Sequence, residues 1–268
     1  MSERPADLPD FRKPPIDEVA VAVQFAPIEG FTSQHIQRFW RTVRDDFPLQ
    51  EKRPRVDIPL ETSGPQAPPN QIQQPAAAQG RAWLISESDD YLIQVQDSTF
   101  VQNWRRREAE YEHFEAVRDR FWKNFRKFRE FLGNNDLAVP RTQQVEVTYI
   151  NWIDKKLSST FVRPMALSVV PIGNAPSEPE DFNWIARYLM SDSTDLFERL
   201  YLQFASAFRA ADPTQVGTQF TLIVRAARAA GIEDDEASRL IDAARRTIVK
   251  VFTELTTPAA HEAWEKFQ

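Results

Sequence analysis

The stretch RAWLISESDDYLIQVQ, residues 81–96, carries the clearest indication of fold class in the chain. Trp83 and Ile85 precede the polar turn SESDD. Three apolar residues follow the turn at every second position: Tyr91, Ile93 and Val95. Apolar residues at alternate positions on both sides of a short polar turn are typical of a β-hairpin. Because the two strands of a hairpin run antiparallel, we expect an antiparallel sheet at the centre of the protein.

Further stretches predict additional strands of the same sheet. IDEVAVAVQF at 16–25 and QQVEVTYINWI at 143–153 alternate apolar with polar or small residues, which is the period of a strand buried on one side. TQFTLIV at 218–224 is a third strand candidate. The segment 196–209 fits a strand and a helix equally well, and we favour a strand because the turn-like ADPTQVG follows it.

Long amphipathic helices are predicted after these strands. From about 105 to 132, apolar residues recur every three or four positions. From about 233 to 255, a second apolar stripe follows an acidic first turn, which suits the helix dipole. Shorter helices are expected after Thr32, which suits an N-cap, and at Pro258, which suits a first helical position.

Two regions lack a clear periodic pattern. Residues 59–80 contain five prolines, five glutamines and almost no apolar residues, which predicts a disordered-like, solvated loop rather than a domain. FVRPMALSVVPI at 161–172 is a strand candidate interrupted by Pro164, and GNAPSEPED at 173–181 is typical of a loop.

Strands outnumber helices and are not separated by regular crossover helices. We therefore predict an α+β fold, with an antiparallel sheet and long amphipathic helices packed on one face. The chain divides into an N-terminal half, residues 1–153, and a C-terminal half, residues 154–268, packed on the first. Each half consists of strands followed by one long helix, so a diverged duplication is compatible with the pattern, although no residue-level repeat supports it.

Composition excludes several classes of function. The 268 residues carry a formal net charge of −6 and include no cysteine and only seven glycines. Disulfides and thiolate chemistry are therefore absent, and a glycine-rich phosphate loop cannot form. No stretch approaches the length of an apolar membrane helix, and the polar N-terminus lacks a signal-peptide core, so we expect a cytoplasmic protein without membrane contact.

Catalytic and metal-binding patterns are also missing. His35, His113 and His261 fall on three different predicted helices without metal-ligand spacing, so we expect no metal and no cofactor. No serine lies in a nucleophile-elbow motif, and acidic residues occur where turns or helix starts explain them. The sequence favours a non-enzymatic protein.

The first candidate site is the junction QVQDSTFVQNWRRREAEY at 94–111, where a strand is predicted to pass into the long helix. One alternative is structural: Trp104 plugs the joint while an arginine pairs with a carboxylate. A second alternative is a nucleic-acid contact in which Trp104 stacks on bases and Arg105, Arg106 and Arg107 bind phosphates. A third is a protein interface, where tryptophan and arginine are favoured.

The second candidate site is a set of polar side chains on the predicted strands. Gln94, Gln96, Asn103 and Asn151 either satisfy backbone groups or line a polar pocket together with Tyr149. The pocket alternative requires that the strands carrying these residues are neighbours and that their side chains share one face.

Four stretches together resemble a family of uncharacterised prokaryotic proteins of sporadic distribution. They are PPIDEVAVAVQFAP at 14–27, RAWLISESDDYLIQVQDSTFVQNWRRR at 81–107, YEHFEAVRDRF at 111–121 and VEVTYINWI at 145–153. The resemblance implies genes that move between genomes, such as phage-defence or toxin–antitoxin loci, and supplies no catalytic residues. The long Pro/Gln loop departs from the family pattern.

Three functions follow as hypotheses. The leading one is a cytoplasmic, non-enzymatic protein-interaction or regulatory protein with a protein partner. An obligate partner should leave an exposed apolar surface on the isolated chain. The second is a small-ligand-binding protein with a pocket between sheet and long helix. The third is an enzyme of unfamiliar type or a nucleic-acid-binding module, the latter disfavoured by the acidic net charge.

Overall fold

The computed structural model describes residues 7–62, 64, 80–107, 110–154, 183–192, 195–209 and 212–268. Within these residues the chain forms nine strands and four helices, in the order β1 (Ile16–Phe25), α1 (Ser33–Val43), β2 (Leu49–Arg53), β3 (Arg81–Ile85), β4 (Tyr91–Gln96), β5 (Thr99–Arg105), α2 (His113–Gly133), β6 (Thr142–Asp154), β7 (Asn183–Asp192), β8 (Phe197–Arg209), β9 (Asp212–Ile232), α5 (Asp234–Leu255) and α6 (Pro258–Ala263).

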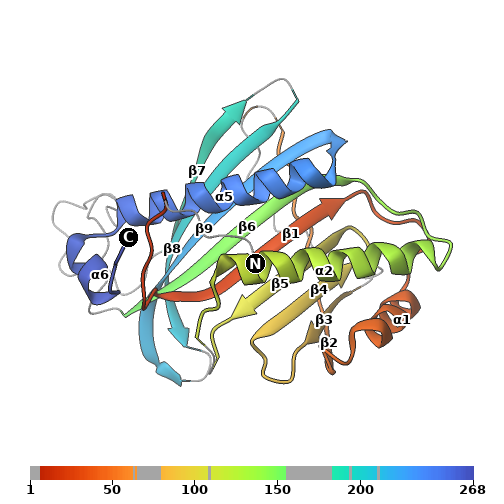
Figure 1. Cartoon of the computed structure of the whole chain (residues 1–268), viewed down its shortest axis with the longest axis horizontal. Coiled ribbons are helices and arrows are strands. Elements are labelled where there is room, and N and C mark those ends of the chain that lie inside the picture. Colours follow the sequence, from red (N-terminus) through yellow and green to blue (C-terminus); the bar gives the residue numbers. More distant parts are fainter. Residues whose placement is uncertain are drawn as a thin grey trace.

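The strands form one antiparallel sheet in the order β2-β3-β4-β5-β1-β6-β9-β8-β7 (Figure 1). The two strands with the cleanest alternation, β1 and β6, pair at its centre. β5 pairs with the other side of β1, and β9 with the other side of β6. The predicted α+β class with an antiparallel sheet is therefore confirmed.

Strand register sorts the side chains between two faces of the sheet. Val19 lies opposite Tyr149 in β6, and Phe114 of α2 stacks on that tyrosine with ring centroids 6.2 Å apart. Phe252 of α5 stacks on Phe220 of β9 at 5.8 Å. We call the face that carries these contacts the helix-side face and the opposite one the open face. Figure 1 shows α2 and α5 crossing in front of the sheet.

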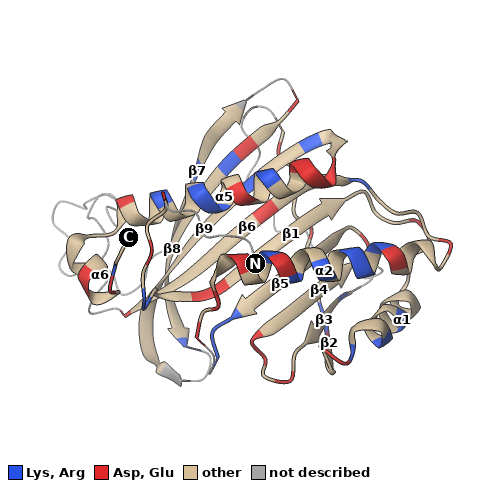
Figure 2. Ribbon diagram, viewed as in Figure 1, with Lys and Arg blue, Asp and Glu red and all other residues tan. Residues whose placement is uncertain are grey.

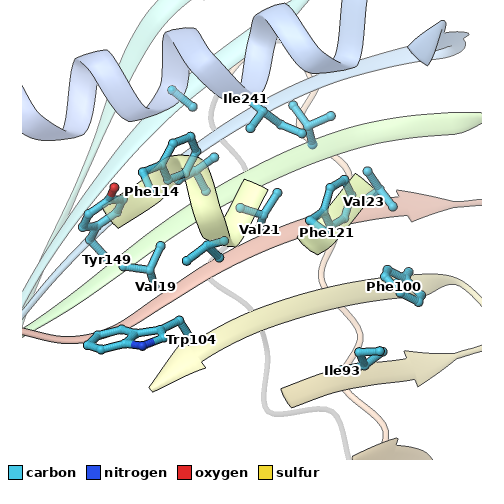
Figure 3. Close-up of a cluster of buried hydrophobic side chains, with 14 of the residues drawn as sticks. Val19, Val21, Val23, Ile93, Phe100, Trp104, Phe114, Phe121, Tyr149 and Ile241 are labelled. Atoms are coloured by element: carbon cyan, nitrogen blue, oxygen red, sulfur yellow. The ribbon is translucent and has the colours of Figure 1, made fainter. Parts of the chain in front are cut away.

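The core fills the space between the helix-side face and the two long helices (Figure 3). Val19, Val21 and Val23 of β1 are all 0% exposed, as the period-two pattern predicted. Full burial of each such side chain contributes roughly 1.5–3 kcal/mol. The aromatic stripe of α2 packs on the same layer, with Phe121 and Phe125 against Phe100 of β5.

Both α2 and α5 carry acidic and basic residues (Figure 2), and three ion pairs join the two helices. They are Arg118–Asp242 at 2.8 Å, Arg129–Asp234 at 2.5 Å and Arg245–Glu115 at 2.9 Å. The first two pairs each have a carboxylate about half exposed and add little stability individually, whereas Arg245 and Glu115 are only 9% and 15% exposed. Their main effect is to fix which charged residues of the two helices face each other.

The predicted start of the long helix is wrong. The helix was expected from about 105, but it begins at His113, and Asn103, Trp104 and Arg105 belong to β5. β5 continues because β1 pairs with it as far as Glu18 opposite Arg105. This pairing occurs between segments far apart in the chain, so local helical periodicity could not reveal it.

The helices and strands predicted for the C-terminal half are confirmed in part. The segment that fitted both states is strand β8, and α5 and α6 begin at Asp234 and Pro258, close to prediction. Strand β7 was missed, and most of the turn-like ADPTQVG belongs to β9. The strand candidate 161–172, the loop 173–181 and most of 59–80 lie outside the described residues.

Candidate functional site

The junction singled out in the sequence is the end of β5, where successive side chains point to opposite faces. Trp104 lies on the helix-side face with 0% exposure, and its ring centroid is 4.8 Å from that of Tyr111 (Figure 3). It closes the core at the joint, as the structural alternative predicted. The alternative in which Trp104 stacks on nucleic-acid bases is wrong, because the indole has no exposed surface.

The three arginines of the junction are held by other parts of the protein. Arg105 and Arg107 both bind the carboxylate of Asp89 in the β3–β4 turn, the latter at 2.6 Å. Arg106 donates hydrogen bonds of 2.9 and 2.7 Å to two backbone carbonyls of residues 14–16. Burial lowers the pKa of both Arg105 and Arg106. These cations therefore stabilise the joint rather than forming a free cluster.

Gln94 and Asn103 belong to one hydrogen-bonded chain on the open face. Trp83 Nε1 donates to Gln94 Oε1 at 3.1 Å, and Arg81 donates to the same oxygen. Gln94 Nε2 donates to Asn103 Oδ1 at 2.8 Å, and Asn103 Nδ2 donates to the carboxylate of Glu18. The two predicted amides are thus brought together, in a chain that ends on a carboxylate the sequence reasoning missed.

Glu18 is a partly buried carboxylate on β1. Burial raises its pKa, although the hydrogen bond from Asn103 and the charge of Arg105 oppose that rise. The signal in the sequence was an acidic residue inside a strand whose other open-face positions are small or neutral. The single hydrogen bond from the neutral Asn103 amide does not offset the loss of hydration on burial, so the ionised form of Glu18 is disfavoured.

Gln96 binds a different segment from Gln94. It exchanges hydrogen bonds with the backbone of Val56, at 2.8 and 3.3 Å. Val56 belongs to residues 54–62, which we call the strap, and which cross the open face without forming a helix or strand. Glu61 of the strap is buried, so the start of the predicted disordered-like loop is anchored, contrary to the prediction.

Tyr149 and Asn151 line a cavity of about 50 Å³ on the helix-side face, beneath the N-terminal arm of residues 7–15. The hydroxyl groups of Tyr149 and Tyr111 are 3.3 Å apart, and Asn151 Nδ2 donates to a β9 carbonyl at 3.1 Å. Burial raises the pKa of both tyrosines. Arg245 also lines the cavity, so its wall carries several polar groups.

The size of this cavity argues against the small-ligand alternative. About 50 Å³ accommodates a few water molecules at roughly 10–15 Å³ each. Pockets for small organic ligands are typically about 300–1,000 Å³. Gln94 lies on the opposite face of the sheet and does not reach this cavity, so the expected pocket joining Gln94, Tyr149 and Asn151 does not form.

The edge strand β7 exposes a row of apolar side chains. Four of its residues are 45–60% exposed: Ile185, Tyr188, Leu189 and Met190. Phe208, near the end of the neighbouring strand β8, is 66% exposed. β7 is the last strand of the sheet in the described part of the chain, so one side of its backbone pairs with no described strand.

The described residues contain no group of three or more His, Asp or Glu side chains that could hold a metal ion. His35, His113 and His261 lie on α1, α2 and α6 respectively, as the sequence predicted. Among the described helices, none combines the length and apolar character needed to cross a bilayer.

No protein-family model, curated protein or solved structure matches this chain. The resemblance to a sporadically distributed prokaryotic family therefore remains a prediction. The geometry of the described residues is what bears on function.

Proposed function

We propose that this chain is a protein-interaction module that binds an extended segment of a partner protein along β7. The observation that carries the proposal is the row of exposed apolar side chains on this edge strand. An unpaired strand edge presents backbone N–H and C=O groups that a second strand can pair with. Exposed apolar side chains beside such an edge mark a surface that a partner covers.

The side chains on β7 indicate the chemistry of the partner segment. On the open face, Ile185 and Leu189 flank Arg187. A strand that pairs here would present apolar residues opposite Ile185 and Leu189. We therefore expect a partner segment with apolar residues at alternate positions.

The opposite edge of the sheet offers a contrast that supports this choice. β2 is five residues long and ends in three charged residues, Glu51, Lys52 and Arg53. Pro54 follows it directly. Short, charged edges bounded by proline resist pairing with another strand. β7 is ten residues long and lacks this charged character.

The proposal keeps the cytoplasmic, non-enzymatic reading of the sequence. The absence of cysteine suits a reducing compartment. A phage-defence or toxin–antitoxin setting rests on the family resemblance alone. The nucleic-acid alternative has lost the exposed tryptophan on which it depended. The ligand alternative placed its pocket between the sheet and a long helix, and the cavity found there has a volume of only about 50 Å³.

We extend the proposal to the origin of the architecture, as a diverged duplication with both long helices on one face. β1 pairs with β5, and β6 pairs with β9. If the second repeat begins at β6 rather than at residue 154, the first strand of each repeat pairs with the last strand before its long helix. The antiparallel β1–β6 pair would then lie on the axis that relates the two halves.

The test compares three tagged full-length chains in the native host: wild type, Leu189→Lys on β7 and Leu49→Lys on β2. Leu49 is 52% exposed and Leu189 is 54% exposed, so the two variants are matched in exposure. Affinity purification with nuclease treatment should recover a stoichiometric partner with wild type and Leu49→Lys. Binding to Leu189→Lys should fall at least about tenfold, since a charge replaces an apolar contact.

Hydrogen exchange of the recovered complex tests the geometry. The backbone amides of β7 should exchange more slowly in the complex than in the free chain, while those of β2 should not change. Partner recovery that is the same for Leu189→Lys and wild type, or β7 amides that exchange at the same rate in both states, would overturn the proposal.

A further inference from the structure

Glu61 of the strap occupies a cationic site on the open face. Its side chain is 0% exposed and faces Arg199 and Arg225, whose side chains are 4% and 14% exposed. Glu61 Oε2 is 3.5 Å from Arg199 Nε, and Glu61 Oε1 is 3.4 Å from Arg225 Nη1. Tyr201 donates its hydroxyl hydrogen bond to the same carboxylate.

The sheet itself leaves this site with excess positive charge. Arg199 in β8 lies directly opposite Arg225 in β9, and like charges at opposite positions repel. Glu146 in β6 binds Arg225, with Oε2 at 2.5 Å from Nε, and so compensates one of the two cations. The second negative charge comes from Glu61, which belongs to no strand.

The carboxylate of Glu61 satisfies the site incompletely. Glu61 Oε2 and Arg199 Nη1 are both buried without a hydrogen-bond partner. Arg199 Nη2 donates instead to the backbone carbonyls of Thr62 and Gly64, at 2.7 and 3.0 Å. A buried guanidinium with an unused N–H is costly, so an anion that reaches it gains a charge-assisted hydrogen bond.

The strap is held by contacts that can be exchanged. It pairs with no described strand, so side-chain contacts hold it in place. Near Glu61 these are the ion pairs to the two arginines, the hydrogen bonds of Arg199 to the strap backbone, and Glu61 N donating to Gln144 Oε1 at 2.8 Å. At the other end of the strap, Gln96 binds the backbone of Val56 and Asp97 pairs with Arg55. A segment that is held without a backbone hydrogen-bond ladder can open locally at a lower free-energy cost than the sheet beneath it.

We propose that Arg199, Arg225 and Tyr201 form an oxyanion-binding site, and that Glu61 occupies it as an internal carboxylate. A carboxylate or phosphate group of an external ligand replaces Glu61 when the strap opens. The site lies beside β7, since Leu189 is opposite Arg199 in the β7–β8 pair. The proposal nevertheless does not depend on partner binding along β7.

The test is chemical rescue of Glu61→Ala in the full-length chain. Thermal unfolding is followed in sodium chloride, sodium acetate and sodium phosphate at matched ionic strength and pH. In chloride the variant should unfold at a lower temperature than wild type, because two guanidiniums share one carboxylate. Acetate or phosphate should then raise its midpoint by at least about 3 °C more than it raises that of wild type.

Two further variants serve as controls. Glu61→Ala/Arg199→Gln should lose the rescue, because one of the two anion-binding cations is gone. Asp97→Ala removes a carboxylate that binds Arg55 of the strap outside the oxyanion site, and should show no anion-specific rescue. If Glu61→Ala does not fold, Glu61→Gln keeps the shape of the side chain, and phosphate binding is titrated directly by calorimetry.

The outcomes separate the sources of the anion. Stronger rescue by acetate identifies a carboxylate ligand, and stronger rescue by phosphate identifies a phosphate group. Rescue that is no greater than in chloride, or that persists in the double variant, overturns the proposal.

Discussion

Glu18, which is partly buried, and Glu61, which is fully buried, are two carboxylates on the same face of one sheet, yet their surroundings differ. Glu61 faces two guanidiniums and a phenol hydroxyl. Glu18 accepts from the neutral amide of Asn103, while the nearby guanidinium of Arg105 binds Asp89. Burial disfavours both charges, so the partner decides whether the charge is compensated. Where only an amide faces it, the carboxylate has a raised pKa.

The largest effect that this comparison predicts comes from Arg225→Met. The variant leaves Glu61 and Glu146 buried with one guanidinium fewer, which should lower the free energy of unfolding by about 3–5 kcal/mol. Urea unfolding at pH 7 measures it. Arg53→Met, which breaks an ion pair of half-exposed side chains, is the control and should cost less than about 1 kcal/mol. Equal costs for the two variants would contradict the comparison.

A smaller loss is expected for Asn103→Ala. The variant removes the donor to Glu18 and the acceptor of Gln94, and the unsatisfied groups should cost about 1–3 kcal/mol at pH 7. Because the lost hydrogen bond favours the ionised carboxylate, the cost should shrink at acidic pH. Urea unfolding at pH 7 and pH 4 tests this, and a cost that grows on acidification would show that Glu18 is not the affected group.

The smallest predicted effect is that of Glu18→Gln, and it is a gain of stability rather than a loss. The pKa of Glu18 is raised above its ordinary value of 4.5, so its stabilising contribution is present below that pH and is lost as pH rises through the folded-state pKa. Glu18→Gln should therefore unfold at a higher temperature than wild type at pH 7, with the difference disappearing below about pH 4.5. A variant that is less stable than wild type at pH 7 would mean that the ionised form is favoured.

The sequence predicted the elements near each carboxylate better than their partners. Alternation along β1 identified the strand and the face on which Glu18 lies. It could not give the register that brings Asn103, 85 residues away, to that carboxylate. Glu61 was assigned to a disordered-like loop because its neighbours are prolines and glutamines, while its partner Arg225 is 164 residues away.

The nine candidate site residues also show that the sequence predicts elements better than the spatial partners of their side chains. Trp104, Tyr149 and Asn151 lie on the helix-side face, whereas Gln94, Gln96 and Asn103 lie on the open face. Only the pairing of β1 with β5 and β6, and of β4 with β5, assigns these side chains to a face, and that pairing is a property of the folded sheet.

The central position of β1 has a consequence for folding during synthesis. Its two neighbours, β5 and β6, begin at residues 99 and 142, so one edge of β1 lacks its partner until β5 has been made and the other edge until β6 has been made. At about 5–20 residues per second, roughly 6–25 s separate the synthesis of β1 from that of β6. Throughout this interval the edge of β1 that pairs with β6 has no partner, and contacts of such long sequence separation form slowly. We expect the yield of native protein to depend on chaperones that cover this segment until residue 154 has left the ribosome.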